Sequence, residues 1–245
     1  MATTHKQPWR VVFFGSGPLA EPTRQALLQR PEYEVVTNHG DVGVLVHYGK
    51  ILSQQVIESF PCGIVNIHPS LLPAWRGPSP LQAAILHGDT ITGVSVMVLD
   101  KHMDTGPLLA QDTLALSAST MAQTLYPELF RVGTQLLFKV LPSYLRGELK
   151  PVPQSTTGSS YSKMISREDG EITATDTPIM IDRKFRAFHP WPGIYYVWNN
   201  QRIKLTNVSL DDNAQLVINE VQPAGKRSMP YADFLRGHPG FKMYN

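Results

Sequence analysis

Three side chains suited to acyl transfer lie between residues 63 and 106 of this sequence. Asn66 and His68 stand two positions apart in the short apolar run GIVNIH, and Asp104 follows in the segment HMDTG. Residues i and i+2 of a β-strand point to the same face, so Asn66 and His68 should project together from the C-terminal end of a strand. Open α/β sheets carry their sites at that edge, and a loop could bring Asp104 to it.

Transfer of an acyl group to an amine is the chemistry that such a set could perform. The Asn66 amide can donate an N–H to a developing oxyanion, and His68 can act as a general acid or a charged donor. Asp104 can hold His68 or accept the amine proton through water. No serine or cysteine nucleophile is required if the amine attacks directly. Each residue alone could be structural, and the three together favour catalysis.

The composition indicates an ordinary globular protein of 245 residues, with 42% hydrophobic and 17% charged residues and a net charge of +2. This charge is too balanced to indicate a nucleic-acid binder by itself. A single cysteine cannot form an intrachain disulfide, and no run approaches the ~20 apolar residues that span a bilayer. The histidines lack metal-ligand spacing. We therefore expect a cytoplasmic monomer with no bound metal and no membrane partner.

The order of the elements predicts an α/β fold with a Rossmann-like, mostly parallel sheet. Strand-like runs at 9–14, 42–48 and 63–67 alternate with helical patterns at 19–30 and 54–60. A hairpin over 92–99 and 108–116 would hold Asp104 in its loop. Only residues 37–41 separate the apolar stretch at 35–36 from the strand at 42–48. A parallel crossover needs about a dozen residues, so we predict that these strands are not neighbours and that one β-α unit is missing.

Composition divides the chain into three parts. Residues 1–150 should form the catalytic domain, and residues 151–188, which begin with PVPQSTTGSSYS, should form a linker. Short strands predicted at 194–198, 202–209 and 215–222 suggest a small β-barrel-like domain over 189–245.

The run NIHPSLLPAWRG, with Asp104 36 residues after His68, closely resembles the formyltransferases that use 10-formyltetrahydrofolate. The resemblance implies catalytic roles for Asn66, His68 and Asp104, and substrate contacts for Ser70 and Arg76. It also implies a folate pocket between the segment after the strand at 42–48 and the loop after Val98. The residues assigned to that pocket are Tyr48, Gly49, Lys50, Ile51, Leu52, Leu99, Asp100, Lys101 and Met103.

The C-terminal part resembles the branch of this family that acts on initiator methionyl-tRNA. The segments FRAFHPWPG and VQPAGKRSM carry this similarity, which implies initiator methionyl-tRNA as partner and Lys226 and Arg227 as contacts. We expect Trp191, which stands between two prolines, to pack at the junction of the two domains rather than to stack on a base. The family's basic loop after the second strand is absent between Thr37 and Val42. Two alternatives stay open: an N-formyltransferase for an amino sugar nucleotide, and a non-catalytic relative that binds RNA.

Overall fold

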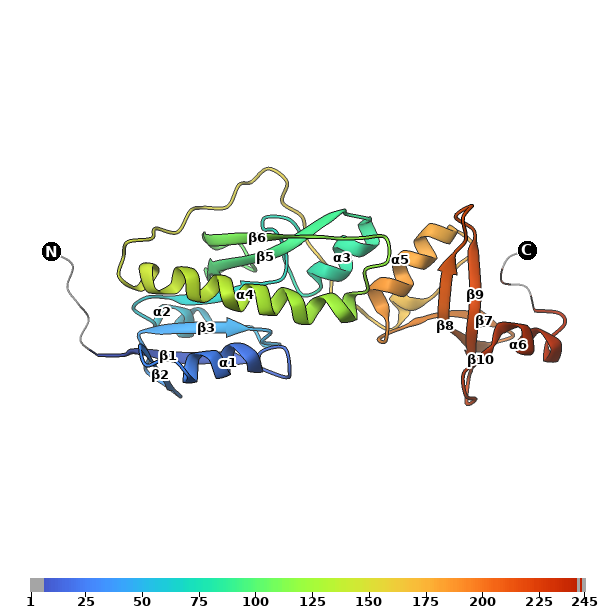
Figure 1. Cartoon of the computed structure of the whole chain (residues 1–245), viewed down its shortest axis with the longest axis horizontal. Helices are drawn as coiled ribbons and strands as arrows, with labels where there is room; N and C mark the ends of the chain where they lie inside the picture. The colour runs from blue at the N-terminus through green and yellow to red at the C-terminus, as the bar shows by residue number, and fades with distance from the viewer. Residues whose placement is uncertain (1–6, 242, 244–245) are drawn as a thin grey trace. The chain divides into compact units, whose positions relative to one another are not determined.

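The computed structural model describes residues 7–241 and 243, which divide into two compact units (Figure 1). The first unit takes in the chain up to residue 80, residues 91–115 and residues 125–162. The second takes in residues 81–90, residues 116–124 and the chain from residue 163 onward.

A six-stranded sheet in the order β2-β1-β3-β4-β5-β6 forms the centre of the first unit. The first four strands in this order run parallel, and β5 and β6 are antiparallel to their neighbours. This arrangement confirms the predicted Rossmann-like, mostly parallel sheet. The strands are β1 Trp9–Gly15, β2 Tyr33–Val36, β3 Val42–Val46, β4 Ile64–His68, β5 Ile91–Val98 and β6 Leu108–Ala115.

Alternation along the strands separates two apolar layers. Val65 and Ile67 of β4 join the cluster that α1 (Glu21–Leu28) and α4 (Ala122–Leu145) cover. Ile64 of the same strand joins a second cluster, which α2 (Gln54–Glu58) contacts. Gly133 lets α4 approach β4 closely, because an added Cβ would meet the Ile67 side chain. The strand that carries the candidate residues is therefore fixed on both sides.

The five-residue link between β2 and β3 crosses β1, because the two strands are staggered. Val36 pairs with Val12 of β1, whereas β3 begins with Val42 at the level of Val11. The link therefore runs sideways instead of returning along a full strand, and no helix lies in it. Two hydrogen bonds between Asp41 and Arg10 hold the link. The Asp41 N–H donates to the Arg10 carbonyl at 2.7 Å, and the Arg10 N–H donates to Oδ2 of Asp41 at 2.8 Å. The prediction that these strands are not neighbours is confirmed.

A four-stranded antiparallel sheet in the order β10-β9-β8-β7 forms the centre of the second unit. Its strands are β7 Ile194–Trp198, β8 Gln201–Leu210, β9 Leu216–Pro223 and β10 Met229–Pro230. The helical elements α3 (Pro80–His87), η1 (Glu168–Gly170), α5 (Pro178–Phe188) and α6 (Tyr231–Gly237) complete the list. The Thr177 hydroxyl caps α5 by accepting from the Met180 N–H. The β-rich C-terminal region predicted from the sequence is present.

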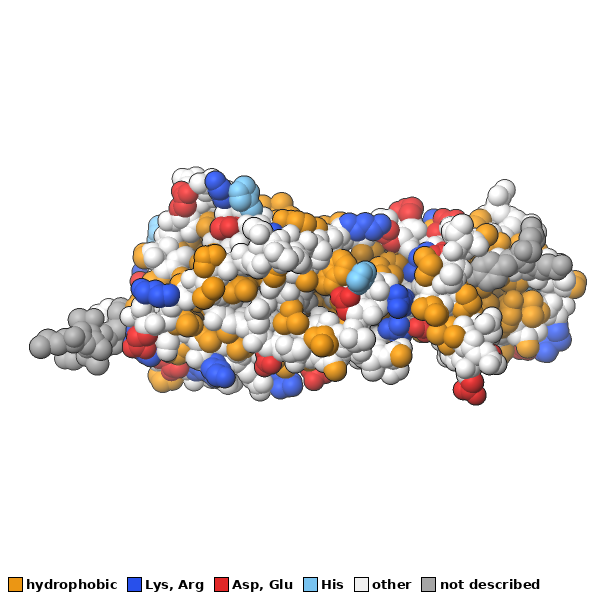
Figure 2. All heavy atoms as spheres, turned by 90° about the horizontal axis from the view of Figure 1, so that it is seen from above, with side chains coloured by type: hydrophobic (Ala, Val, Ile, Leu, Met, Phe, Trp, Pro, Cys, Tyr) orange, Lys and Arg blue, Asp and Glu red, His pale blue; other side chains and the backbone are white. Residues whose placement is uncertain are grey.

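The segment expected to be a linker takes part in both units. Val152 exchanges two backbone hydrogen bonds of 2.8 Å with Leu108, so the chain here belongs to the first unit. Residues 178–188 form α5 in the second unit. Among the described residues, no helix is long and apolar enough to cross a membrane. Figure 2 shows charged side chains of both signs interspersed over one face, as the small net charge suggests.

Candidate active site

The fourth strand places Asn66 and His68 on one face at its C-terminal end. Met97 and Ser95 lie opposite them on β5. Both side chains are buried, with Asn66 6% and His68 4% exposed. Within the described chain, no side-chain hydrogen bond of the Asn66 amide is formed. Its two N–H groups remain available, which is what an oxyanion site requires.

The two ring nitrogens of His68 face different partners. Nε2 lies 3.2 Å from the carbonyl oxygen of Trp75, which can only accept, so Nε2 carries a hydrogen in this contact. Nδ1 lies 3.8 Å from Oδ1 of Asp104. That distance allows electrostatic attraction but is too long for a direct hydrogen bond. Nδ1 is therefore the nitrogen left to exchange a proton.

Asp104 reaches His68 because the β5–β6 loop folds back along the sheet. The loop leaves β5 at the far end of β4, where the Leu99 N–H donates to the Ile64 carbonyl. Asp104 has a φ of 53°, in the left-handed region that L-residues rarely adopt. The Gly77 N–H donates to its Oδ2 at 2.8 Å. Oδ1 is thereby left to face the histidine.

Gln154 holds the Asp104 loop, and no sequence pattern indicated it. Its Nε2 donates to the carbonyl oxygens of Asp104 and Gly106, both at 2.8 Å. Its Oε1 accepts from Nε and Nη2 of Arg76, at 3.1 and 2.7 Å. One amide therefore connects the loop of Asp104 with the loop after β4. Its position in a segment that reads as a linker gave no signal of this role.

The two predicted substrate contacts after β4 are engaged within the protein. The Ser70 hydroxyl is 1% exposed and donates to the Ala74 carbonyl at 2.7 Å. Arg76 is 8% exposed and, besides Gln154, reaches the Tyr161 hydroxyl with Nη1 at 3.2 Å. Both side chains hold the loop that supplies Gly77 and Trp75 to the site. The geometry therefore supports a positioning role for them.

The predicted folate segments meet on one apolar cluster. Leu52 and Leu99 pack against the same buried residues, which are Val12, Phe60 and Ile64. Tyr48 lies edge-on to Phe14, with ring centroids 5.8 Å apart. Beyond the cluster, Gly49, Lys50, Ile51, Lys101 and Met103 are exposed, with Ile51 at 89% and Met103 at 52%. The Asp100 carboxylate accepts from the His102 N–H and the Thr105 hydroxyl, so it organises its own loop.

The remaining predicted residues lie in the second unit. Lys226 and Arg227 are exposed on the turn between β9 and β10. The Trp191 side chain is 59% exposed. In the part of the chain that the structure describes, no three His, Cys, Asp or Glu side chains converge as a metal site would require.

Comparison with known sequences gives two matches to family profiles. One described as formyl transferase matches residues 10–141, and one described as formyl transferase, C-terminal domain, matches residues 164–216. A methionyl-tRNA formyltransferase of Roseiflexus sp. (strain RS-1) is 38% identical over 268 residues, covering 94% of this chain and 82% of the relative. One of Chloroflexus aurantiacus (strain ATCC 29366 / DSM 635 / J-10-fl) is 40% identical over 223 residues, covering 80% and 71%.

Solved structures share the fold at low sequence identity. Methionyl-tRNA formyltransferase from Clostridium thermocellum is 19% identical with a TM-score of 0.67, over 88% of this chain and 98% of that one. HypX from Aquifex aeolicus in complex with tetrahydrofolic acid is 18% identical with a TM-score of 0.71. That match covers 94% of this chain and 47% of HypX, so the chain spans about half the length of HypX.

Proposed function

Because the chain belongs to the formyl transferase family, we propose that it transfers a formyl group from 10-formyltetrahydrofolate to the amino group of initiator methionyl-tRNA. The observation that carries the proposal is the joint placement of Asn66, His68 and Asp104 at the end of β4. The names of the relatives that are 38% and 40% identical support the acceptor.

The donor supplies the formyl group, and the protein's own residues supply the environment for its transfer. The free Asn66 amide donates to the formyl oxygen as negative charge develops there. His68 is fixed through Nε2 by Trp75 and presents Nδ1 as a second donor. Asp104 accepts the proton of the attacking amine, directly or through a water, as the new carbon–nitrogen bond forms. When the bond from the formyl carbon to the folate nitrogen breaks, Nδ1 of His68 gives that nitrogen a proton, and the proton taken up by Asp104, 3.8 Å away, replaces it on the ring.

The residues around the site fit a folate donor. Leu52 and Leu99 pack on one apolar cluster, and Ile51 and Met103, in the same two segments, expose their side chains. Apolar side chains are suited to bind a flat ring system, and the buried Asn66 amide is suited to its polar reacting end. These observations support the assigned pocket residues, which include Tyr48 and the backbone of Gly49 and Lys50.

An amino sugar nucleotide is the second candidate acceptor, and the short β2–β3 link favours it. The alignment with the Roseiflexus relative spans 268 residues, more than the 245 of this chain, so that relative has residues without a counterpart here. In this chain the link at residues 37–41 holds no helix and no lysine or arginine. An acceptor without a nucleic-acid stem would not need a basic loop there.

The deciding experiment is a formylation assay with 10-formyltetrahydrofolate and initiator methionyl-tRNA. Wild-type protein is compared with Asp104→Asn and with Asp112→Asn, a matched control at an exposed position of β6. We expect the wild type and the control to formylate the tRNA and kcat of Asp104→Asn to fall about 100-fold or more, because a general base is lost.

A parallel reaction replaces the tRNA with a dTDP-linked amino sugar. Transfer to the sugar alone would overturn the tRNA acceptor while keeping the catalytic assignment. Near-normal kcat in Asp104→Asn would overturn the role of Asp104. Binding of tetrahydrofolate without transfer to either acceptor would leave the non-catalytic relative as the better description.

A further inference from the structure

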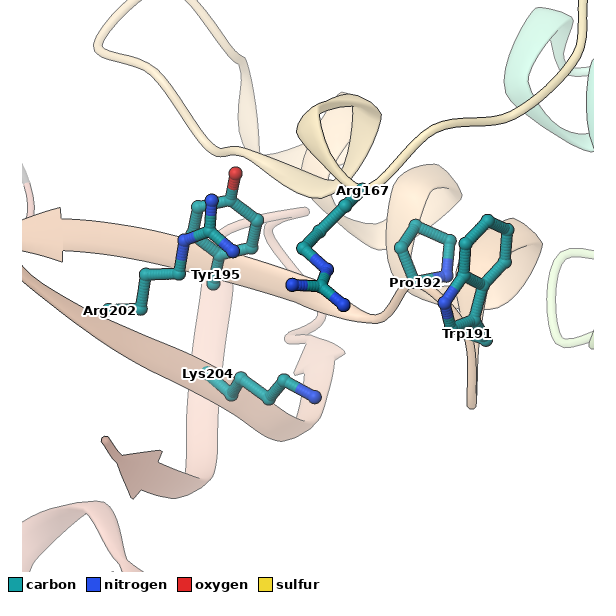
Figure 3. A pocket seen from close by; sticks show the side chains of 6 residues that line it. All are labelled: Arg167, Trp191, Pro192, Tyr195, Arg202 and Lys204. Carbon is teal, nitrogen blue, oxygen red and sulfur yellow. The ribbon is translucent and has the colours of Figure 1, made fainter. Parts of the chain in front are cut away.

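A pocket of about 250 Å³ lies on the second unit. The segments that line it come before and after α5 in the sequence. Figure 3 shows the side chains that line it, which are Arg167, Trp191, Pro192, Tyr195, Arg202 and Lys204. In this view the guanidinium of Arg167 lies between the Tyr195–Arg202 pair and the Trp191–Pro192 turn, and the amine of Lys204 extends toward the same space.

The backbone holds these segments together. Tyr195 of β7 pairs with Lys204 of β8, and Arg202 is two residues before Lys204, so the three side chains share one face. The Ile172 N–H donates to the Tyr195 carbonyl at 2.8 Å, which fixes the chain after η1 alongside the edge strand β7. Gly170 lies so close to Gly193 that a Cβ added at Gly170 would meet the Gly193 carbonyl oxygen. Arg167, three residues before Gly170, and Trp191, two residues before Gly193, are thereby brought to the same pocket.

The pocket is cationic, and its cations are not neutralised within the described chain. Among the residues that the structure describes, no carboxylate lies within 4.0 Å of a side-chain nitrogen of Arg167, Arg202 or Lys204. Glu168 is near enough to both arginines to feel their charge but forms no ion pair with them. Arg202 lies over the Tyr195 ring, 4.4 Å from its centroid, which orients the guanidinium. Three positive groups around one space attract a phosphate.

Trp191 adds an aromatic surface to this charge. The side chain is 59% exposed, although a tryptophan normally buries its large apolar area. Exposed aromatic faces beside cationic grooves are the usual platform for unpaired bases of single-stranded nucleic acid. The volume of about 250 Å³ is below the usual size of a cofactor pocket, so it suits one nucleotide unit rather than a dinucleotide.

We propose that this pocket binds one unpaired nucleotide of an RNA strand, with the base stacked on Trp191 and its phosphate held by Arg167, Arg202 and Lys204. The inference deepens the proposed function, because the tRNA acceptor would be the RNA that enters the pocket. It also extends the predicted contact surface beyond Lys226 and Arg227, which lie on the β9–β10 turn.

Fluorescence anisotropy with the full-length protein and a labelled five-nucleotide single-stranded RNA tests the pocket without any formyl transfer. The comparison probe is an abasic strand of the same length. We expect the abasic strand to bind about tenfold more weakly. Trp191→Ala should weaken binding of the base-containing strand about tenfold and leave binding of the abasic strand unchanged. Trp191→Phe should retain most of the affinity for the base-containing strand.

The charge requirement is tested by salt dependence. Lys204→Gln should reduce the slope of log affinity against log salt by about 0.7, the value for one phosphate contact on a single strand. Lys139→Gln removes the same charge from an exposed position of α4 in the first unit and should leave the slope unchanged.

Equal binding of both strands, or no effect of Trp191→Ala, would overturn the stacking site and indicate an anion site only. Tighter binding of a duplex of the same sequence would equally overturn it. Formylation of tRNA with an unchanged KM in Trp191→Ala would refute the pocket and leave the proposed function intact. Binding of the single strand as predicted, without any transfer to tRNA, would refute the function and leave the pocket intact.

Discussion

Replacement of Gln154 by leucine tests whether one amide positions the catalytic loop. The change removes two hydrogen bonds donated to the loop carbonyls and two accepted from the guanidinium of Arg76. The neutral bonds contribute about 1 kcal/mol each, and a buried charged donor left without an acceptor costs about 1–3 kcal/mol. We expect Gln154→Leu to lower the free energy of unfolding by about 3–5 kcal/mol, measured by urea denaturation.

The same change should slow the reaction. Asp104 is held at a φ of 53°, a conformation that costs about 1–2 kcal/mol and persists only while its surroundings enforce it. Release of that strain would let Asp104 move away from His68, and kcat would fall about tenfold.

Gln154→Glu separates the two effects. A glutamate can still accept from Arg76, but it cannot donate to the carbonyls of Asp104 and Gly106 and would repel them. Stability should therefore fall less than in Gln154→Leu, while kcat should fall at least as far. Gln135→Leu, at an exposed position of α4, is the matched control and should change neither quantity. If both Gln154 variants keep kcat within about twofold of the wild type, the positioning role is wrong.

Three further changes test other parts of the fold. Burial raises the pKa of Tyr33 to about 12, and its hydroxyl is without a partner among the described residues. The unfolded chain ionises first, so the wild type should lose about 2–3 kcal/mol of stability between pH 10 and 12, and Tyr33→Phe should lose less, as read from urea midpoints at each pH. Burial alone would raise the pKa of Asp176, but the Lys184 amine at 2.8 Å and the Thr173 N–H hold that pKa below its ordinary value. Asp176→Asn should cost about 2 kcal/mol at pH 7, and in chemical denaturation its stability should fall less than the wild type's as pH drops below 4. Gly77 has a φ of 102°, and an added Cβ would lie 2.7 Å from the Ser162 carbonyl, so Gly77→Ala should lower thermal stability by about 2 kcal/mol and reduce kcat.

Each of these has an outcome that would contradict it. An alkaline transition of Tyr33→Phe identical to that of the wild type would refute the burial effect. Unchanged stability of Asp176→Asn at pH 7 would show that the Lys184 pair contributes nothing. Gly158→Ala is the control for Gly77, because Gly158 has a φ of 78° but nothing lies within 4 Å of an added Cβ. Equal losses in the two alanine variants would mean that backbone strain alone accounts for the effect.

The sequence by itself determined the sheet, its missing unit and the pairing of Asn66 with His68. These features depend on local rules. Strand periodicity of two puts both side chains on one face, and the length of the chain between residues 36 and 42 excludes an intervening helix. That β1 lies between these strands, in a staggered register, came from the structure, because register is a property of the whole sheet.

Only the tertiary structure decided which polar groups are free and which are engaged. Ser70 and Arg76 are residue types that often contact substrates, yet both side chains form hydrogen bonds within the protein. Ser70 donates to the Ala74 carbonyl, and Arg76 donates to Gln154. The Ser162 hydroxyl, 86 residues further along the chain, donates to the Arg76 carbonyl. Gln154 gave no local signal, because the partners of a side chain depend on segments that folding brings together. A spacing can predict that Asp104 returns to His68, but only the contacts of Gly77 and Gln154 explain how it is held there.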